Sequence, residues 1–218
     1  MIKSLNKDDF NYHRLIQHGN NSLKIFIFSF LSLIILPISV SQAITPIQNK
    51  QLVAYATDLP RAVIYDHPAY RKINYPNGDV PAHYGVCSDV IIRSYRGIGI
   101  DLQKLLHEDI KANFALYPSK RIWGLSRPDT NIDHRRVPNL EVFFSRKGKV
   151  KPISKEASDY LPGDIVSWRL DNGRPHIGLV IDKKSSDNQR YLVMHNIGFG
   201  QVAEDVLFSW KITGHYSY

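Results

Sequence analysis

The sequence predicts an α+β fold in which N-terminal helices pack on a C-terminal antiparallel sheet of about five strands. Two observations carry this prediction. Before residue 117 apolar residues recur at helical spacing, whereas from residue 140 on short segments rich in β-branched and aromatic residues alternate with turn residues. Because the helical segments precede the strands instead of alternating with them, we expect an antiparallel rather than a parallel sheet.

The first 43 residues have the organisation of a secretory signal peptide. Residues 1–24 are polar and net positive, and residues 25–40 are almost wholly apolar and end before Ser41-Gln42-Ala43. This apolar run of 16 residues is shorter than the roughly 20 that span a bilayer, which disfavours the alternative of a retained membrane anchor. We therefore predict cleavage after Ala43, a periplasmic location and a single domain over residues 44–218.

The net charge of the chain indicates what kind of partner it can bind. The chain has 28 Lys and Arg against 20 Asp and Glu, and without the leader, which holds four of the former and two of the latter, six positive charges remain in excess. This excess suits an acidic polymer, and we expect no nucleic acid, no cofactor and no membrane contact after cleavage. The chain has one cysteine, so the thiol is either reactive, bonded to another molecule or a small buried hydrophobe.

The N-terminal half is expected to hold three helical regions. Residues 51–67 predict one or two short helices on the outside of the core, interrupted at Pro60. A second helix spans about residues 86–96 and stops at a Gly-Ile-Gly segment. A third helix spans residues 102–115 and is capped by Asp101.

The C-terminal half is expected to supply the strands of the sheet, because its apolar segments are short and are bounded by Gly, Pro, Asn and Asp. The predicted strands are Leu140–Phe144, Ile165–Arg169, Ile177–Asp182, Tyr191–Asn196 and Trp210–Tyr216.

A polar, basic segment, residues 117–139, connects the two halves and carries His134, Arg135 and Arg136. A connection of this length in a compact domain is usually functional or disordered. Its arginines could bind carboxylates through bidentate hydrogen bonds. The alternative is a solvated loop with a structural ion pair between Asp133 and an arginine.

Cys87 is the main candidate for a reactive group. Val90, Ile91, Ser94 and Tyr95 follow it at helical spacing, so the thiol shares the inward-facing stripe of its own helix. In the first turn of a helix, the unpaired backbone N–H groups and the helix dipole favour a thiolate. A histidine that reaches this position from elsewhere in the chain would make the thiol a nucleophile.

Two of the predicted strands form a hairpin with its turn near residues 186–187. This register places His176, the candidate base, beside His195 or Asn196, either of which could accept its other ring proton and fix its tautomer. Gly178 is expected to leave room above the sheet for the helix that carries the thiol. The remaining histidines lack metal-ligand spacing and the sequence has no His-Glu-x-x-His motif, so no metal site is predicted.

These motifs, taken in order, resemble those of the NlpC-type cell-wall peptidases, a bacterial branch of the papain-like clan. The motifs are Cys87 at the start of a helix, Leu161-Pro162-Gly163-Asp164-Ile165-Val166, His176-Ile177-Gly178-Leu179-Val180 and Val193-Met194-His195. The resemblance implies a papain-like fold and a cysteine endopeptidase or amidase that acts on peptidoglycan stem peptides. It also implies Cys87 as nucleophile, His176 as base and His195 as orienter.

Within that clan, residues 44–218 resemble more closely an exported bacterial family that is described as a domain of unknown function. The shared segments are Gly78-Asp79-Val80-Pro81, Gly85-Val86-Cys87-Ser88-Asp89-Val90, Gly99-Ile100-Asp101-Leu102-Gln103, Asn131-Ile132-Asp133-His134-Arg135-Arg136-Val137-Pro138-Asn139-Leu140, His195-Asn196-Ile197-Gly198 and Gly214-His215-Tyr216. The number and order of these segments make the family assignment specific, although they do not define the activity.

The resemblance also bears on oxyanion and substrate contacts. NlpC-type enzymes often use a tyrosine shortly before the cysteine in the oxyanion hole, which points to Tyr75 or Tyr84, and Asn196 is a further candidate. The aspartate that usually precedes the cysteine and meets the substrate's amine is replaced by Val86. The candidate substrate-binding residues are Asp89, His134, Arg135 and Arg136.

Two other functions are compatible with these residues. One is a non-catalytic module of the same fold that binds the cell wall, although such a module would tend to lose Cys87, His176 or His195. The other is acyl or amide transfer, because an amine can capture the acyl-enzyme in place of water.

Overall fold

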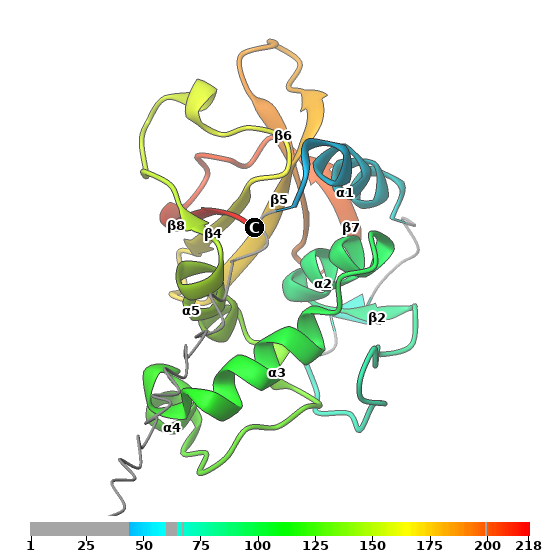
Figure 1. Cartoon of the computed structure of the whole chain (residues 1–218). Helices are drawn as coiled ribbons and strands as arrows, with labels where there is room; N and C mark the ends of the chain where they lie inside the picture. The colour runs from blue at the N-terminus through cyan, green and yellow to red at the C-terminus, as the bar shows by residue number, and fades with distance from the viewer. Residues whose placement is uncertain (1–43, 60–64, 67, 199) are drawn as a thin grey trace, which may run out of the picture. The chain divides into compact units, whose positions relative to one another are not determined.

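The computed structural model describes residues 44–59, 65–66, 68–198 and 200–218 (Figure 1). The predicted signal peptide, residues 1–43, lies outside the described residues. None of the helices in the described ranges is long and apolar enough to cross a membrane.

Within the described residues, five α-helices precede the main sheet, which confirms the predicted order of helices before strands. They are α1 (Pro46–Asp58), α2 (Cys87–Gly97), α3 (Leu102–Ala112), α4 (Ser119–Trp123) and α5 (Val137–Lys147). The predicted cap of α3 is present, because the Asp101 side chain accepts a hydrogen bond from the Lys104 backbone N–H at 3.2 Å.

The main sheet has six strands in the order β3-β8-β4-β5-β6-β7, and every neighbouring pair is antiparallel. The strands are β3 (Lys149–Val150), β4 (Ile165–Arg169), β5 (Pro175–Lys184), β6 (Tyr191–Asn196), β7 (Gln201–Glu204) and β8 (Lys211–Ser217). A separate parallel pair joins β1 (Tyr65–Asp66) to β2 (Tyr84–Gly85). The α+β class and the antiparallel sheet are thus confirmed.

One predicted strand is wrong, because Leu140–Phe144 lies within α5. The aromatic and β-branched content of this segment favours a strand. However, Leu140, Phe143 and Phe144 are spaced as positions i, i+3 and i+4, and all three are buried on one helical face. Pro138, in the first turn, also suits a helix start. The short strands β3 and β7 were not predicted.

The first helix lies deeper than predicted. It begins at Pro46, where Thr45 and Gln48 form a capping box, and it buries Leu52 and Ala56 completely. Both residues belong to the main hydrophobic core, so α1 packs in the helical layer rather than outside the core.

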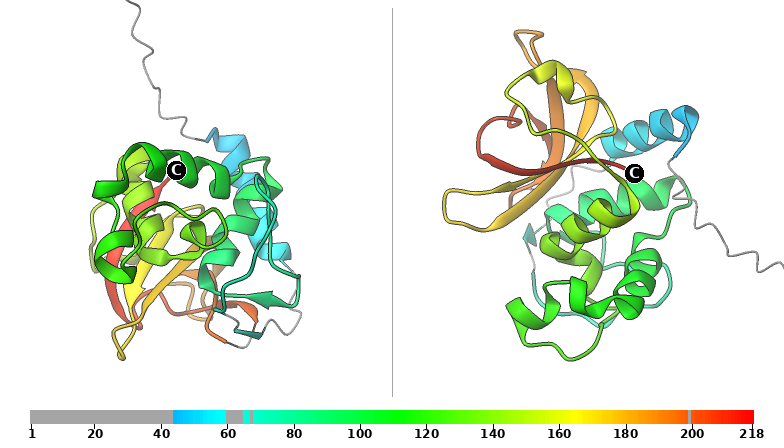
Figure 2. Two further views of the ribbon diagram at one scale, coloured as in Figure 1. Left: turned by 90° about the horizontal axis from the view of Figure 1, so that it is seen from below. Right: turned by 60° about the vertical axis from the view of Figure 1, so that its left-hand side comes forward.

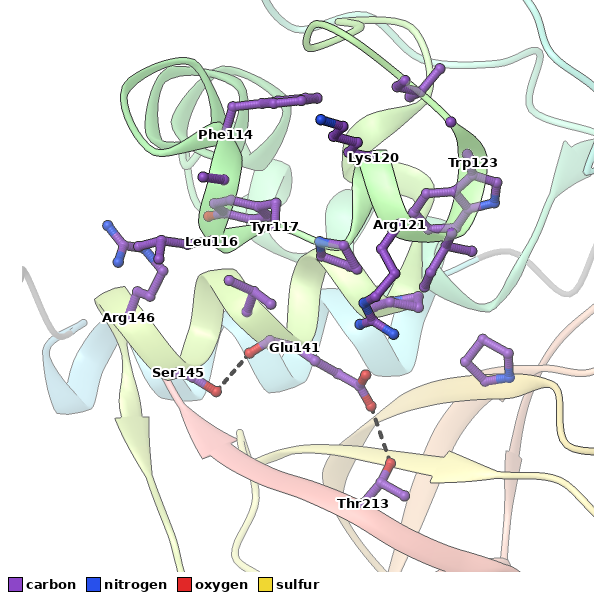
Figure 3. Close-up of a pocket in the computed structure, with 18 of the residues that line it drawn as sticks. Phe114, Leu116, Tyr117, Lys120, Arg121, Trp123, Glu141, Ser145, Arg146 and Thr213 are labelled. Atoms are coloured by element: carbon purple, nitrogen blue, oxygen red, sulfur yellow. Dashed lines mark hydrogen bonds between the residues drawn. The ribbon is translucent and has the colours of Figure 1, made fainter.

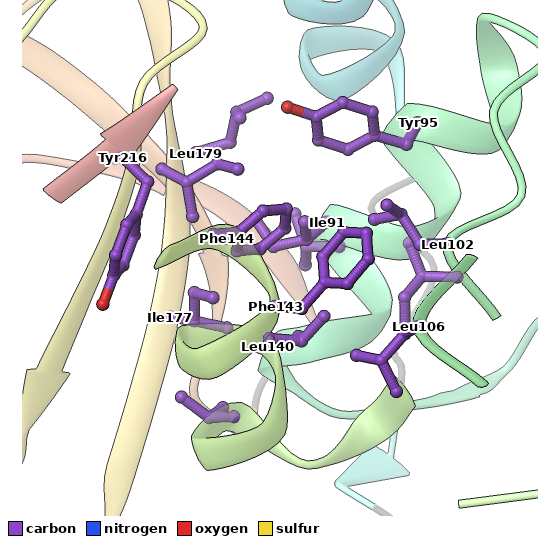
Figure 4. Close-up of a cluster of buried hydrophobic side chains, with 14 of the residues drawn as sticks. Ile91, Tyr95, Leu102, Leu106, Leu140, Phe143, Phe144, Ile177, Leu179 and Tyr216 are labelled. Atoms are coloured by element: carbon purple, nitrogen blue, oxygen red, sulfur yellow. The ribbon is translucent and has the colours of Figure 1, made fainter. Parts of the chain in front are cut away.

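The helical layer covers one face of the sheet (Figure 2). Helices α1 and α2 contact each other and β5, and α5 contacts β5 and β8. Figure 4 shows side chains of α2, α3 and α5 meeting Ile177, Leu179 and Tyr216 of the strands. This core holds the start of α2 against the sheet, which positions the site described below.

A second, smaller core covers the opposite face of the sheet. Because successive strand residues point to opposite faces, Val166 and Trp168 of β4 lie on this side together with Val180 and Val193. Leu207, from the segment between β7 and β8, is also buried there and accepts a hydrogen bond from the Trp168 indole N–H at 3.0 Å.

Candidate active site

Cys87 is the first residue of α2 and is half-buried. The residues predicted to share its inward-facing stripe, Val90, Ile91, Ser94 and Tyr95, are all completely buried. The thiol therefore lies at the end of a helix that is firmly packed along one side. Its first-turn backbone N–H groups can stabilise a thiolate or an oxyanion there.

A buried ion pair holds this end of α2 in place. Asp89 accepts a hydrogen bond from the Val86 backbone N–H at 2.7 Å and is bound by Arg135, whose Nε lies 3.0 Å from Oδ1 and whose Nη2 lies 2.9 Å from Oδ2. The Ser88 hydroxyl donates to the Arg135 carbonyl oxygen at 2.7 Å. Because both oxygens of Asp89 are occupied inside the protein, Asp89 and Arg135 position the helix, and their contact with a substrate stays a prediction.

Two buried histidines from neighbouring strands are hydrogen-bonded to each other. His176 lies near the start of β5 and His195 near the end of β6, and Nε2 of His176 is 3.0 Å from Nδ1 of His195. The strands pair Leu179 with Met194, which is the register predicted from the position of the turn. The predicted neighbourhood of His176 and His195 is therefore confirmed.

Glu204 of β7 sets the direction of the hydrogen bonds through this pair. Its Oε2 lies 2.9 Å from Nε2 of His195, and because a carboxylate only accepts, His195 donates from Nε2. A neutral His195 then accepts at Nδ1 from the Nε2–H of His176, so a neutral His176 keeps its lone pair on Nδ1. Sequence analysis missed Glu204, since β7 has only four residues and shows no clear alternation.

Burial keeps the His176 ring neutral. Burial, with smaller contributions from the charges of His195 and Arg174, lowers the pKa of His176 to about 3. Burial also lowers the pKa of His195, against the opposing effect of the Glu204 carboxylate. A neutral His176 at neutral pH is the form that can accept a proton as a general base.

The two histidines lie on the face of the sheet opposite the helices. His176 pairs with Trp168 of β4, and their ring centroids are 5.8 Å apart. Gly178 faces the same side, where an added Cβ would lie 2.5 Å from Cγ1 of Val193 and 3.3 Å from Cβ of His195. The prediction that Gly178 makes room for the helix is therefore wrong. Gly178 instead makes room for β6, because the atoms nearest to an added Cβ belong to that strand. Gly178 faces the same side as His176, since strand residues two apart share a face.

Cys87 and His176 line the same cavity, which has a volume of about 240 Å³. Cys87 reaches it from the helical side, and His176 reaches it from near the start of β5. The lining includes Arg135, Arg136 and Arg174 but, among the described residues, no carboxylate. Across the described ranges, no group of three or more His, Cys, Asp or Glu side chains is arranged to hold a metal ion.

Asn196 also lines this cavity and is only 4% exposed. Its Oδ1 accepts a hydrogen bond from the Gly198 backbone N–H at 2.9 Å, whereas its Nδ2 is buried without a hydrogen-bond partner in the described part of the chain. A buried donor of this kind is costly unless a ligand satisfies it. Because His195 already occupies the position beside His176, Asn196 suits an oxyanion contact better than the orienter role.

The two candidate tyrosines lie elsewhere. The Tyr75 ring packs against the His107 ring with centroids 5.2 Å apart. The Arg71 guanidinium lies over the Tyr84 ring, and its Cζ is 4.3 Å from the ring centroid. Neither tyrosine is among the described residues that line the cavity, so their role in the oxyanion hole stays a prediction.

The basic segment 117–139 is largely ordered by short helices and an ion pair. Arg136 contacts Asp133 at 3.2 Å, which confirms the structural ion pair of the predicted alternative, but its solvated loop is wrong, because Asp133, His134 and Arg135 are buried. Arg136 also lies 4.1 Å from the ring centroid of Trp123 and lines the cavity. His134 is buried, which lowers its pKa to about 4, and its contact with a substrate stays a prediction.

The fold and the site define an α+β protein in which a helix-terminal thiol shares a cavity with one histidine of a buried, hydrogen-bonded pair. Residues 53–218 match the family described as a domain of unknown function (DUF1287), and the chain belongs to this family. Over 156 residues it is 60% identical to the uncharacterized protein YijF of Escherichia coli strain K12, an alignment that covers 72% of this chain and 74% of that protein. The predicted membership of a family of unknown function is confirmed.

Proposed function

We propose that this protein is a periplasmic cysteine hydrolase, an endopeptidase or amidase that cleaves peptidoglycan stem peptides with an NlpC-type, papain-like arrangement of residues. One observation carries the proposal. Cys87 at the N-terminus of α2 and His176 line one cavity, and His195 and Glu204 stand behind His176 in a hydrogen-bonded chain. The order of motifs along the sequence and the predicted signal peptide support the substrate and the compartment.

The first half of the reaction forms an acyl-enzyme. Nδ1 of His176 takes the proton of the Cys87 thiol, and the thiolate attacks the substrate carbonyl carbon to form a C–S bond. The displaced electron pair moves to the carbonyl oxygen, for which first-turn N–H groups of α2 and Nδ2 of Asn196 are the candidate donors. The C–N bond then breaks, and His176 gives its proton to the leaving amine.

The second half restores the enzyme. His176 takes a proton from water, the water oxygen attacks the thioester, and the C–S bond breaks to release a carboxylic acid and the Cys87 thiolate. The thiolate then recovers the proton from His176. His195 and Glu204 touch no reacting atom in these steps. They are positioning residues that hold the tautomer and the orientation of His176.

The test compares the unmodified protein with the Cys87→Ala variant on purified peptidoglycan, with mass spectrometry of the soluble products. We expect new peptide termini from the unmodified protein and none from the variant. Release of the same products by both proteins would contradict a cysteine mechanism. If neither releases product but both sediment with peptidoglycan, the non-catalytic binding module is correct, and a product joined to an added amine would indicate acyl transfer.

A further inference from the structure

A larger open groove adjoins the catalytic cavity. It has a volume of about 1820 Å³ and lies between the segment around α4, helix α5 and the strands (Figure 3). It shares five residues with the cavity that Cys87 and His176 line, namely Pro68, Trp123, Pro138, Arg174 and Pro175. A substrate chain that enters the catalytic cavity can therefore continue along this groove.

Two of the cations that line the groove are already neutralised. Arg169 contacts Glu141 at 2.8 Å, and Arg146 contacts Asp109 at 2.7 Å. Glu141 is the carboxylate in the described lining of the groove, and its Oε1 also accepts a hydrogen bond from the Thr213 hydroxyl at 3.1 Å. These ion pairs stabilise the walls of the groove. Because Glu141 is bound by Arg169 and Thr213, it is not available to bind a positively charged ligand.

The other three cations of the groove are Lys120, Arg121 and Arg174, all exposed. None of them forms an ion pair with a described carboxylate. In Figure 3 Arg121 extends from α4 into the groove. Arg174 lies two residues before His176 and lines both the groove and the catalytic cavity, so a positive charge that no described carboxylate pairs with stands at their junction.

The catalytic cavity beside the thiol also lacks negative charge. Its described lining has no carboxylate to receive a substrate amine, and the residue that precedes Cys87 is Val86. A guanidinium matches a carboxylate in geometry as well as in charge, because two parallel N–H groups can bind its two oxygens. The site is therefore complementary to a substrate that is acidic near the bond to be cleaved.

We propose that Arg174 binds a substrate carboxylate beside the scissile bond, and that Arg121 and Lys120 bind a second carboxylate farther along the groove. This inference rests on the proposed function and makes it more specific, since it assigns an acidic peptide to the groove and names the residues that select it. Peptides whose carboxylates are amidated are poor ligands of this site.

The test measures binding without catalysis. Calorimetric titration of the Cys87→Ala protein uses an alanyl-γ-glutamyl-diaminopimelate tripeptide with free carboxylates, and its fully amidated analogue. We expect the acidic peptide to bind about tenfold more tightly, as one charge-assisted hydrogen bond implies, and added salt to reduce the difference. Arg174→Gln in the same background should remove part of this preference and leave the part that Arg121 and Lys120 supply. Lys183→Gln, which removes an exposed charge at the other end of β5, should preserve it.

The outcomes separate this inference from the hydrolytic activity. Equal affinities for the two peptides, no binding of either peptide, or an unchanged preference in Arg174→Gln would overturn the carboxylate site. A preference that depends on Arg174 would support it even if the unmodified protein released no product from peptidoglycan. In that case the hydrolysis proposal alone would fail, and the groove would serve a binding module.

Discussion

Two buried histidine clusters lie on the same face of the main sheet, and they use their ring nitrogens differently. His215 of β8 donates from Nδ1 to the Pro152 carbonyl oxygen at 2.9 Å and from Nε2 to Asp164 at 2.9 Å. Lys151 reaches the same carboxylate at 2.6 Å, and the Tyr160 ring stacks on the imidazole, with centroids 4.2 Å apart. Every polar group in this cluster is occupied within the protein.

The His176 cluster, which consists of His176, His195 and Glu204, differs from the His215 cluster in having a ring nitrogen left for a reacting group. Both ring nitrogens of His215 are engaged by acceptors within the protein, the Pro152 carbonyl oxygen and Asp164, so neither is left for a reacting group. The chain from Glu204 through His195 leaves Nδ1 of His176 with a lone pair, and His176 lines the cavity of Cys87. The partners of a buried histidine, rather than its burial, therefore decide whether it can act as a base.

The largest expected effect comes from removing His176, the proposed base, or Cys87, the proposed nucleophile. Cys87→Ala and His176→Gln should each lower the rate of peptide release from peptidoglycan by about 10³-fold or more, because the two residues act as one unit. His215→Gln, corrected for the folded fraction, should retain the rate. Product release measured by mass spectrometry at matched concentrations of folded protein tests this, and equal losses in His176→Gln and His215→Gln would contradict the distinction.

The largest effect on stability should come from the His215 cluster. Asp164→Asn leaves Lys151 without its counter-charge and takes a carboxylate acceptor from His215 in a buried site, which should lower the free energy of unfolding by about 3–5 kcal/mol. Urea denaturation measures this loss. The control is Asp187→Asn, which changes an exposed carboxylate beside Arg190. If both variants unfold at the same urea concentration, the His215 cluster does not stabilise the fold as argued.

Acid should weaken the fold through the histidines that are buried as neutral rings. The pKa of His176 is lowered to about 3 and that of His134 to about 4, whereas an unfolded histidine titrates near 6.5. The unfolded chain therefore binds more protons as pH falls through 6.5, so each ring should remove about 2 kcal/mol of stability between pH 7 and pH 5. Urea denaturation across this range should show a shallower pH dependence in His176→Gln. An unchanged slope would contradict the assignment.

The smallest expected effect comes from Glu204, whose side chain is 49% exposed. Glu204→Gln should lower the rate of hydrolysis roughly tenfold, less than loss of the base, because water can take over part of its contact with His195. A structural defect would not move the pH profile of kcat/KM, whereas loss of the positioning carboxylate should, and Glu204→Asp should recover part of the rate. An unaltered profile in Glu204→Gln would exclude the positioning role.

Local patterns in the sequence predicted the parts of the site that depend on neighbouring residues. The helix behind Cys87 follows from residues three, four, seven and eight positions later, and the meeting of His176 with His195 follows from the length of one hairpin. At Leu140–Phe144 the composition favours a strand, whereas the 3.6-residue spacing of the same residues favours the helix that forms. Local signals compete in such short apolar runs, and burial against the sheet decides between them.

The sequence by itself determined the α+β class, the lone thiol in the first turn of α2 and the pairing of the two strands that carry His176 and His195, because periodicity and turn position act over a few residues. Only the tertiary structure decided that the histidines face away from the helices, that Glu204 completes their hydrogen-bonded chain, and that Asp89 is bound by Arg135. These contacts join residues that are nine to 46 positions apart, and packing alone brings such residues together.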